Sequence, residues 1–119
     1  MSENIKEAIT KAIGSHGMWK ARLRDAIESQ TSEFEVDFVR SCHNCEFGKW
    51  LDDDKSELAQ DKFYDTIYNM HKDVHMKTAN VMSLALEGKS AEAQESMDGQ
   101  FTESSTALIS EMMKWSKSL

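Results

Sequence analysis

The sequence contains no proline and only five glycines among its 119 residues. Because proline and glycine mark tight turns and the ends of short strands, a chain with so few of them favours long helices over many strands. The length predicts one domain, residues 1–119, which is large enough to bury a hydrophobic core without disulfide bonds.

Basic residues are also scarce. The chain has 14 Lys and Arg against 21 Asp and Glu, which gives a formal net charge of −7. No cluster of basic side chains is present that would follow a phosphate backbone or an anionic membrane, so we expect neither nucleic-acid binding nor membrane docking.

Long apolar runs are absent too, so we expect no direct membrane insertion. The first 14 residues are amphipathic and include acids, unlike a signal or transit peptide. We therefore expect a cytoplasmic protein, and the opening residues favour a native N-terminus. Cys42 and Cys45 are too close in sequence to link distant elements, and in that compartment they indicate metal or redox chemistry.

Apolar residues recur every three or four positions in three stretches, as is typical of amphipathic helices. The first predicted helix covers residues 3–30. The second opens at Asp54, which forms a capping pair with Glu57, and stops at Gly88. In the third helix, Ser90 is the predicted N-cap.

Residues 31–54 lack a sustained period, and we expect short helical turns there. The fold class is therefore all-α: an antiparallel four-helix-bundle-like domain with three long helices plus an irregular, short-helical segment that forms the fourth wall.

Four side chains predict a metal site. His71 and His75 lie one helical turn apart, although such pairs are common enough by chance that two ordinary histidines would explain them. His16 falls on the apolar stripe of the first helix, where a buried ring needs a partner. With the Cys45 thiolate, the three imidazoles complete a tetrahedral shell that suits zinc, whereas magnesium and calcium prefer oxygen ligands.

Three segments resemble the chemoreceptor zinc-binding (CZB) family. Its first histidine and tryptophan match His16 and Trp19, and its paired histidines match His71 and His75. The most specific segment follows its cysteine–glycine–tryptophan motif: Cys45-Glu46-Phe47-Gly48-Lys49-Trp50-Leu51.

The resemblance implies a Zn²⁺ ion in a four-helix bundle and sensing of zinc or of oxidants such as hypochlorous acid. It also implies a homodimer that works with a signalling output protein or domain, of the chemoreceptor type or of the diguanylate cyclase type that makes cyclic di-GMP. The chain departs from the family pattern because no output domain is found in this sequence, which is therefore either a stand-alone module or a fragment, and because Cys42 and His43 precede the motif cysteine.

Cys42 opens a rival shell of two cysteines with His71 and His75, which would leave His16 buried without a ligand role. The shell of three histidines and Cys45 is favoured. Cys42 is either a resolving thiol for an oxidised Cys45 or a bystander. Trp19 and Trp50 are the candidates for covering the site, although simple packing is the stronger explanation of Trp50.

Other function classes fit less well. A zinc hydrolase of the HExxH type needs a glutamate where Lys72 stands, and four protein ligands leave no open position for water, so we expect no enzyme. A hemerythrin-like carrier needs more than the four histidines present. A metal-free helical interaction module would require His16 and Cys45 to be core residues by coincidence.

Overall fold

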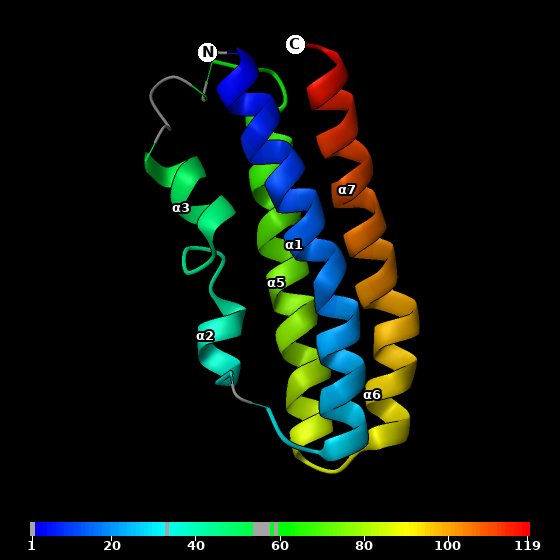
Figure 1. Cartoon of the computed structure of the whole chain (residues 1–119). Coiled ribbons are helices and arrows are strands. Elements are labelled where there is room, and N and C mark those ends of the chain that lie inside the picture. The colour runs from blue at the N-terminus through cyan, green and yellow to red at the C-terminus, as the bar shows by residue number, and fades with distance from the viewer. Residues whose placement is uncertain (1, 33, 54–57, 59) are drawn as a thin grey trace.

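The computed structural model describes residues 2–32, 34–53, 58 and 60–119, and helices dominate this part of the chain. Figure 1 shows three long helical columns side by side: α1, α5, and a third made of α6, η1 and α7. Two short helices cover one side. The bounds are α1 (Ser2–Ser29), α2 (Val36–Arg40), α3 (Glu46–Asp53), α5 (Tyr64–Leu86), α6 (Ser90–Ser96), η1 (Met97–Phe101) and α7 (Thr102–Lys117).

The predicted all-α bundle is confirmed. The irregular segment forms the fourth side through α2, α3 and the turn between them, and we call residues 36–53 the wall. The wall packs against α5 and α1 (Figure 1). The long helices supply most of the core, whose largest fully buried apolar side chains include Ile9, Leu23, Ile67, Met82, Met97, Phe101, Leu108, Met112 and Trp115.

Helix α5 ends where the sequence predicts. Gly88 has φ of 78°, the left-handed conformation that glycine adopts without steric cost. The N–H of Gly88 donates to the Ala85 carbonyl at 3.1 Å, and the N–H of Lys89 donates to the Leu84 carbonyl at 2.9 Å. These two bonds make a Schellman motif, which satisfies the last carbonyls of the helix.

The start of α5 differs from the prediction. The pair Asp54 and Glu57 lies outside the described residues, and α5 itself begins at Tyr64. Asp61 explains the late start, because its carboxylate accepts the Phe63 N–H at 2.9 Å and the Trp115 indole N–H at 2.9 Å. These bonds hold residues 61–63 in a turn instead of a helix.

The third column also differs in detail. Ser90 is the first residue of α6, not its N-cap; Lys89 takes that position and makes no side-chain cap. The predicted cap was wrong because the Schellman turn already places the Lys89 carbonyl to accept the Ala93 N–H at 2.9 Å. Further on, the column widens into the π-helical turn η1, where the Thr102 hydroxyl donates to the Met97 carbonyl at 2.7 Å.

No described helix combines the length and the apolar character needed to cross a bilayer.

Candidate metal centre

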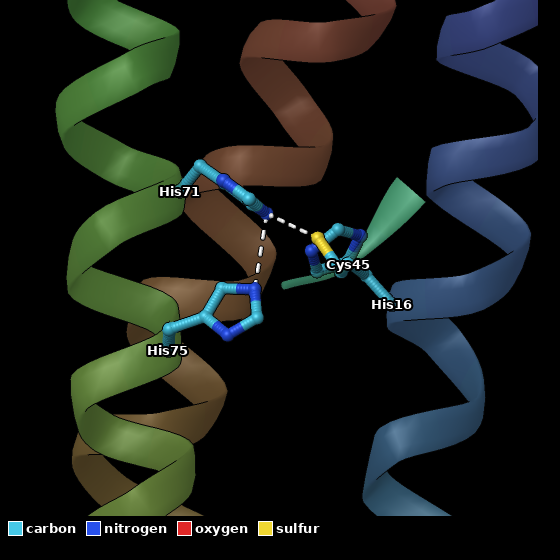
Figure 2. A group of neighbouring side chains, drawn as sticks. All are labelled: His16, Cys45, His71 and His75. Atoms are coloured by element: carbon cyan, nitrogen blue, oxygen red, sulfur yellow. Dashed lines mark hydrogen bonds between the residues drawn. The ribbon is translucent and has the colours of Figure 1, made fainter. Parts of the chain in front are cut away.

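The four predicted ligands converge inside the bundle. His16 comes from α1, Cys45 from the turn before α3, and His71 and His75 from α5. One nitrogen or sulfur atom from each lies within 4.8 Å of the corresponding atom of every other. Figure 2 shows the four side chains pointing toward one another across the space between α5 and α1.

Backbone carbonyls orient two of the imidazoles. The Nδ1–H of His16 donates to the Ala12 carbonyl at 2.8 Å, and the Nδ1–H of His75 donates to the Val39 carbonyl at 2.7 Å. Because a carbonyl only accepts, the proton of each neutral ring sits on Nδ1. The Nε2 lone pairs are therefore free to bind a cation, as in metal sites where an outer hydrogen bond fixes the tautomer of the ligand.

His71 lies at the middle of the cluster. Its Nε2 is 3.2 Å from the Cys45 sulfur and 3.1 Å from Nε2 of His75 (Figure 2). In a tetrahedral zinc shell with the usual bond lengths, neighbouring ligand atoms are about 3.3–3.6 Å apart. These contacts are thus close to the spacing that one zinc ion requires.

Burial keeps all three imidazoles neutral. Burial, with smaller contributions from the nearby His75 and His16, lowers the pKa of His71 to about 2. Burial also lowers the pKa values of His16 and His75, although their backbone hydrogen bonds oppose the shift. A neutral imidazole is the form that binds a metal, so the cluster needs no deprotonation of histidine at neutral pH.

Cys45 occupies the N-cap position of α3. Its carbonyl accepts the Lys49 N–H at 3.0 Å, and its sulfur accepts the Gly48 N–H at 3.3 Å. Burial raises the pKa of the Cys45 thiol, while the Gly48 N–H stabilises the thiolate and opposes that rise. A cation bound at the sulfur would complete the deprotonation.

Gly48 has a steric role that explains its place in the motif. A Cβ atom at this position would lie 1.6 Å from the Cys42 carbonyl oxygen, far inside van der Waals contact. Glycine at position 48 lets α3 pack this closely against the Cys42 carbonyl in the turn before it.

Aromatic rings cover the cluster. Phe47 meets the His71 ring edge-on, with 5.1 Å between centroids, and meets the His16 ring in the same way at 6.1 Å. Trp50 stacks on Phe47 at 5.7 Å and lies 6.0 Å from Trp115. Trp50 therefore contacts the ring that covers the imidazoles.

Trp19 lies one turn beyond His16 on α1. Its ring is 5.2 Å from Phe34 and 5.0 Å from the Arg22 guanidinium, a cation–π distance.

Cys42 is buried, but among the described side chains the group that converges contains His16 and not Cys42. The backbone of Cys42 contributes instead, because its carbonyl lies 3.9 Å from the Cys45 sulfur. His43 also stands apart from the cluster: it is exposed, and its Nδ1–H donates to the Asp52 carboxylate at 2.6 Å.

Sequence reasoning missed the groups that orient the ligands. The carbonyls of Ala12 and Val39 carry no side-chain signature, and Val39 lies 36 positions before His75. Gly48 was visible as a motif residue, but the approach of the Cys42 carbonyl to it was not.

Helical columns that enclose three neutral imidazoles and a thiol define a metal-binding helical domain. The family model of the chemoreceptor zinc-binding domain, CZB, matches residues 16–82, which is more than half of the chain and includes all four clustered side chains. The chain belongs to this zinc-binding family. No curated protein and no solved structure matches it.

Proposed function

We propose that this chain binds one zinc ion through His16, Cys45, His71 and His75 and acts as a sensory module, not as an enzyme. The observation that carries the proposal is the convergence of the four ligand atoms within 4.8 Å, with the lone pairs of two imidazoles aimed inward by backbone carbonyls. Membership of a zinc-binding family supports the choice of metal.

The donor set favours zinc on chemical grounds. Three neutral nitrogens and one thiolate suit a borderline-soft ion that prefers four ligands, and they suit magnesium or calcium poorly. When bound, zinc holds the thiolate and the imidazoles in one shell. Because the protein supplies all four ligands, no position is left for a water nucleophile, which supports a sensory role over hydrolysis.

The location of the cluster supports signalling by a change in packing. His16 belongs to α1, Cys45 to the wall, and the other two ligands to α5, so loss of one ligand loosens three segments at once. Zinc availability, or oxidation of the single thiolate, is the proposed input. The proposed output is a chemoreceptor or a diguanylate cyclase, reached as a cytoplasmic homodimer.

Elemental analysis of the purified protein tests the site, with Cys45→Ala and Cys42→Ala as a matched pair. We expect about one zinc per chain in the parent and in Cys42→Ala, and a sharply lower zinc content in Cys45→Ala. Absence of zinc from every preparation, or an equal loss in both variants, would count against the proposal.

A further inference from the structure

A cavity of about 540 Å³ lies beside the cluster, between α1 and the wall. On the α1 side, the residues that line it extend from Glu7 to Arg22, which is about 22 Å along a helix. Its lining also includes buried residues, so the cavity reaches into the molecule: Ala12, His16, Phe47 and His75. Sites for small molecules are concave and have volumes of about 300–1,000 Å³, and this cavity has both properties.

Aromatic side chains are concentrated in the lining. The chain has five Phe, three Trp and two Tyr residues, and half of these ten line the cavity: Trp19, Phe34, Phe38, Phe47 and Trp50. Only Phe47 is buried, and the other four keep exposed surface. Aromatic surface that remains uncovered beside a cavity favours a ligand with a planar ring, because rings stack or meet edge to face.

The protein already places a planar group on two of these rings. The Arg22 guanidinium lies 5.0 Å from the centroid of the Trp19 ring and 5.5 Å from that of the Phe34 ring. A guanidinium group is flat and stacks on aromatic faces. Because Arg22 is exposed, its side chain can turn into solvent when a ligand ring takes its place.

The charged groups at the cavity give no preference for one sign of charge. Two acids and two bases line it, and all four are exposed: Glu7, Glu46, Lys11 and Arg22. Their formal charges cancel, and salt screens charges that are exposed to solvent. Recognition therefore depends on contact with aromatic rings and on burial of apolar surface.

We propose that this cavity is a binding site for small aromatic molecules, and that binding there is coupled to the adjacent metal centre. The coupling follows from the position of the aromatic residues, since Phe38, Phe47 and Trp50 belong to the wall. A wall that bound metal holds against α1 and α5 keeps these rings in place. The aromatic ligand and the metal therefore each raise the affinity for the other by the same factor. Only this coupling rests on the proposed zinc site.

A fluorescence titration tests binding. The protein is added to a fixed, low concentration of N-phenyl-1-naphthylamine, an uncharged probe whose emission rises in apolar surroundings. We expect a saturable rise with a Kd of about 0.2 mM or tighter, the affinity typical of a ligand of this size.

Competition tests the preference for aromatic rings. The alcohols 2-phenylethanol and 2-cyclohexylethanol differ only in the saturation of the ring. After correction for their partition from water into octanol, we expect 2-phenylethanol to displace the probe at about fivefold lower concentration. Equal displacement by the two alcohols would overturn the assignment of the ligand class.

Two variants with matched exposure locate the site. Phe38 is 54% exposed and lines the cavity, whereas Met18 is 57% exposed and does not. We expect Phe38→Ala to weaken probe binding about threefold or more and Met18→Ala to leave it unchanged. Trp19→Leu should weaken it further, and circular dichroism checks that each variant is folded.

The titration is repeated with zinc and with a chelator. We expect chelation to weaken probe binding about fivefold, at the lower end of the usual range of coupling between two sites. Equal affinities in the two conditions would overturn the coupling. A protein without zinc that still binds the probe would contradict the proposed function alone, while a zinc-loaded protein that does not bind it would contradict this inference alone.

A second copy of the chain is the alternative occupant. If the probe does not bind, and Phe38→Ala changes the mass in sedimentation equilibrium while Met18→Ala does not, the cavity belongs to an interface between copies and the proposal is overturned.

Discussion

The long helical columns and the wall are held in place by different forces. Along the columns, apolar side chains interlock for many turns, and α1 alone has 28 residues. The wall has two short helices of 5 and 8 residues, which bury few apolar side chains, namely Val39, Phe47 and Leu51. Burial of apolar area therefore stabilises the columns strongly and the wall weakly.

Polar contacts contribute much of the remaining stabilisation of the wall. The Val39 carbonyl accepts from His75, the Leu51 carbonyl accepts the Tyr64 hydroxyl at 2.9 Å, and Cys45 meets the cluster. Two of these three contacts involve proposed zinc ligands. The comparison teaches that a change at the cluster acts first on the wall, because the wall buries less apolar area than the columns, which keep their own core.

Removal of zinc should produce the largest difference in local stability between the wall and the columns. With the metal chelated, we expect backbone amides of residues 36–53 to exchange hydrogen about a thousandfold faster, a loss of about 4 kcal/mol of local stability. Amides in the middle of α5 and α7 should change far less. Hydrogen-exchange mass spectrometry with and without a chelator checks this, and uniform loss of protection along the chain would contradict the comparison.

Gly48→Ala should destabilise the wall by a steric clash. The added methyl group would strike the Cys42 carbonyl, so we expect a loss of about 3 kcal/mol or more in the free energy of unfolding, together with loss of metal. Gly14→Ala is the matched control, because nothing lies within 4 Å of a Cβ there and alanine favours the helix by about 0.5–1 kcal/mol. Urea unfolding measures both, and similar values for the two would refute the steric role.

Acid provides a graded way to disturb the cluster in the metal-free protein. The folded pKa values of His16, His71 and His75 lie below the ordinary 6.5, so the unfolded chain takes up protons first as pH falls. The free energy of unfolding should be nearly independent of these groups above about pH 7.5 and should fall as the pH drops from 7 to 6, with about 0.7 kcal/mol of that fall from His71 alone.

Urea unfolding with a chelator at a series of pH values tests this slope. A stability that rises on acidification would show that these imidazoles are charged in the folded protein.

The smallest expected effect comes from the tyrosines that hold the end of α3. Tyr64→Phe removes a buried bond to the Leu51 carbonyl and should cost about 1 kcal/mol. Tyr68→Phe is the control: its hydroxyl lies 3.5 Å from the exposed Asp52 carboxylate, and we expect less than about 0.5 kcal/mol. Thermal unfolding compares the stabilities of the two variants. A larger loss in Tyr68→Phe would show that the Tyr68 hydroxyl makes the stronger hydrogen bond to α3.

Local sequence signals located the columns. The apolar period placed α1 within one residue at each end, and Gly88 marked the end of α5, because helical period and left-handed glycine are properties of neighbouring residues. The start of α5 and the π-helical turn were not predicted. Asp61 receives the Trp115 indole N–H from 54 positions away, and no local pattern encodes such a bond.

The candidate site also combines features that the sequence predicts with features that it does not. The identity of the clustered side chains could be inferred from residue type, spacing and the motif around Cys45. The carbonyls that orient His16 and His75, the clearance that Gly48 provides, and the separation of the Cys42 sulfur from the cluster depend on how the wall meets the columns. Tertiary packing decides these features, and a single sequence does not display it.

The tilted pair of indoles at Trp50 and Trp115 gives the protein an internal optical signal. One ring belongs to the wall and the other is fully buried in α7, with centroids 6.0 Å apart and planes at 42°. Two chromophores held this close in a fixed, chiral arrangement couple electronically and contribute to near-ultraviolet circular dichroism, which disappears when fixed packing is lost. Displacement of the wall can therefore be followed in the unlabelled protein, in real time.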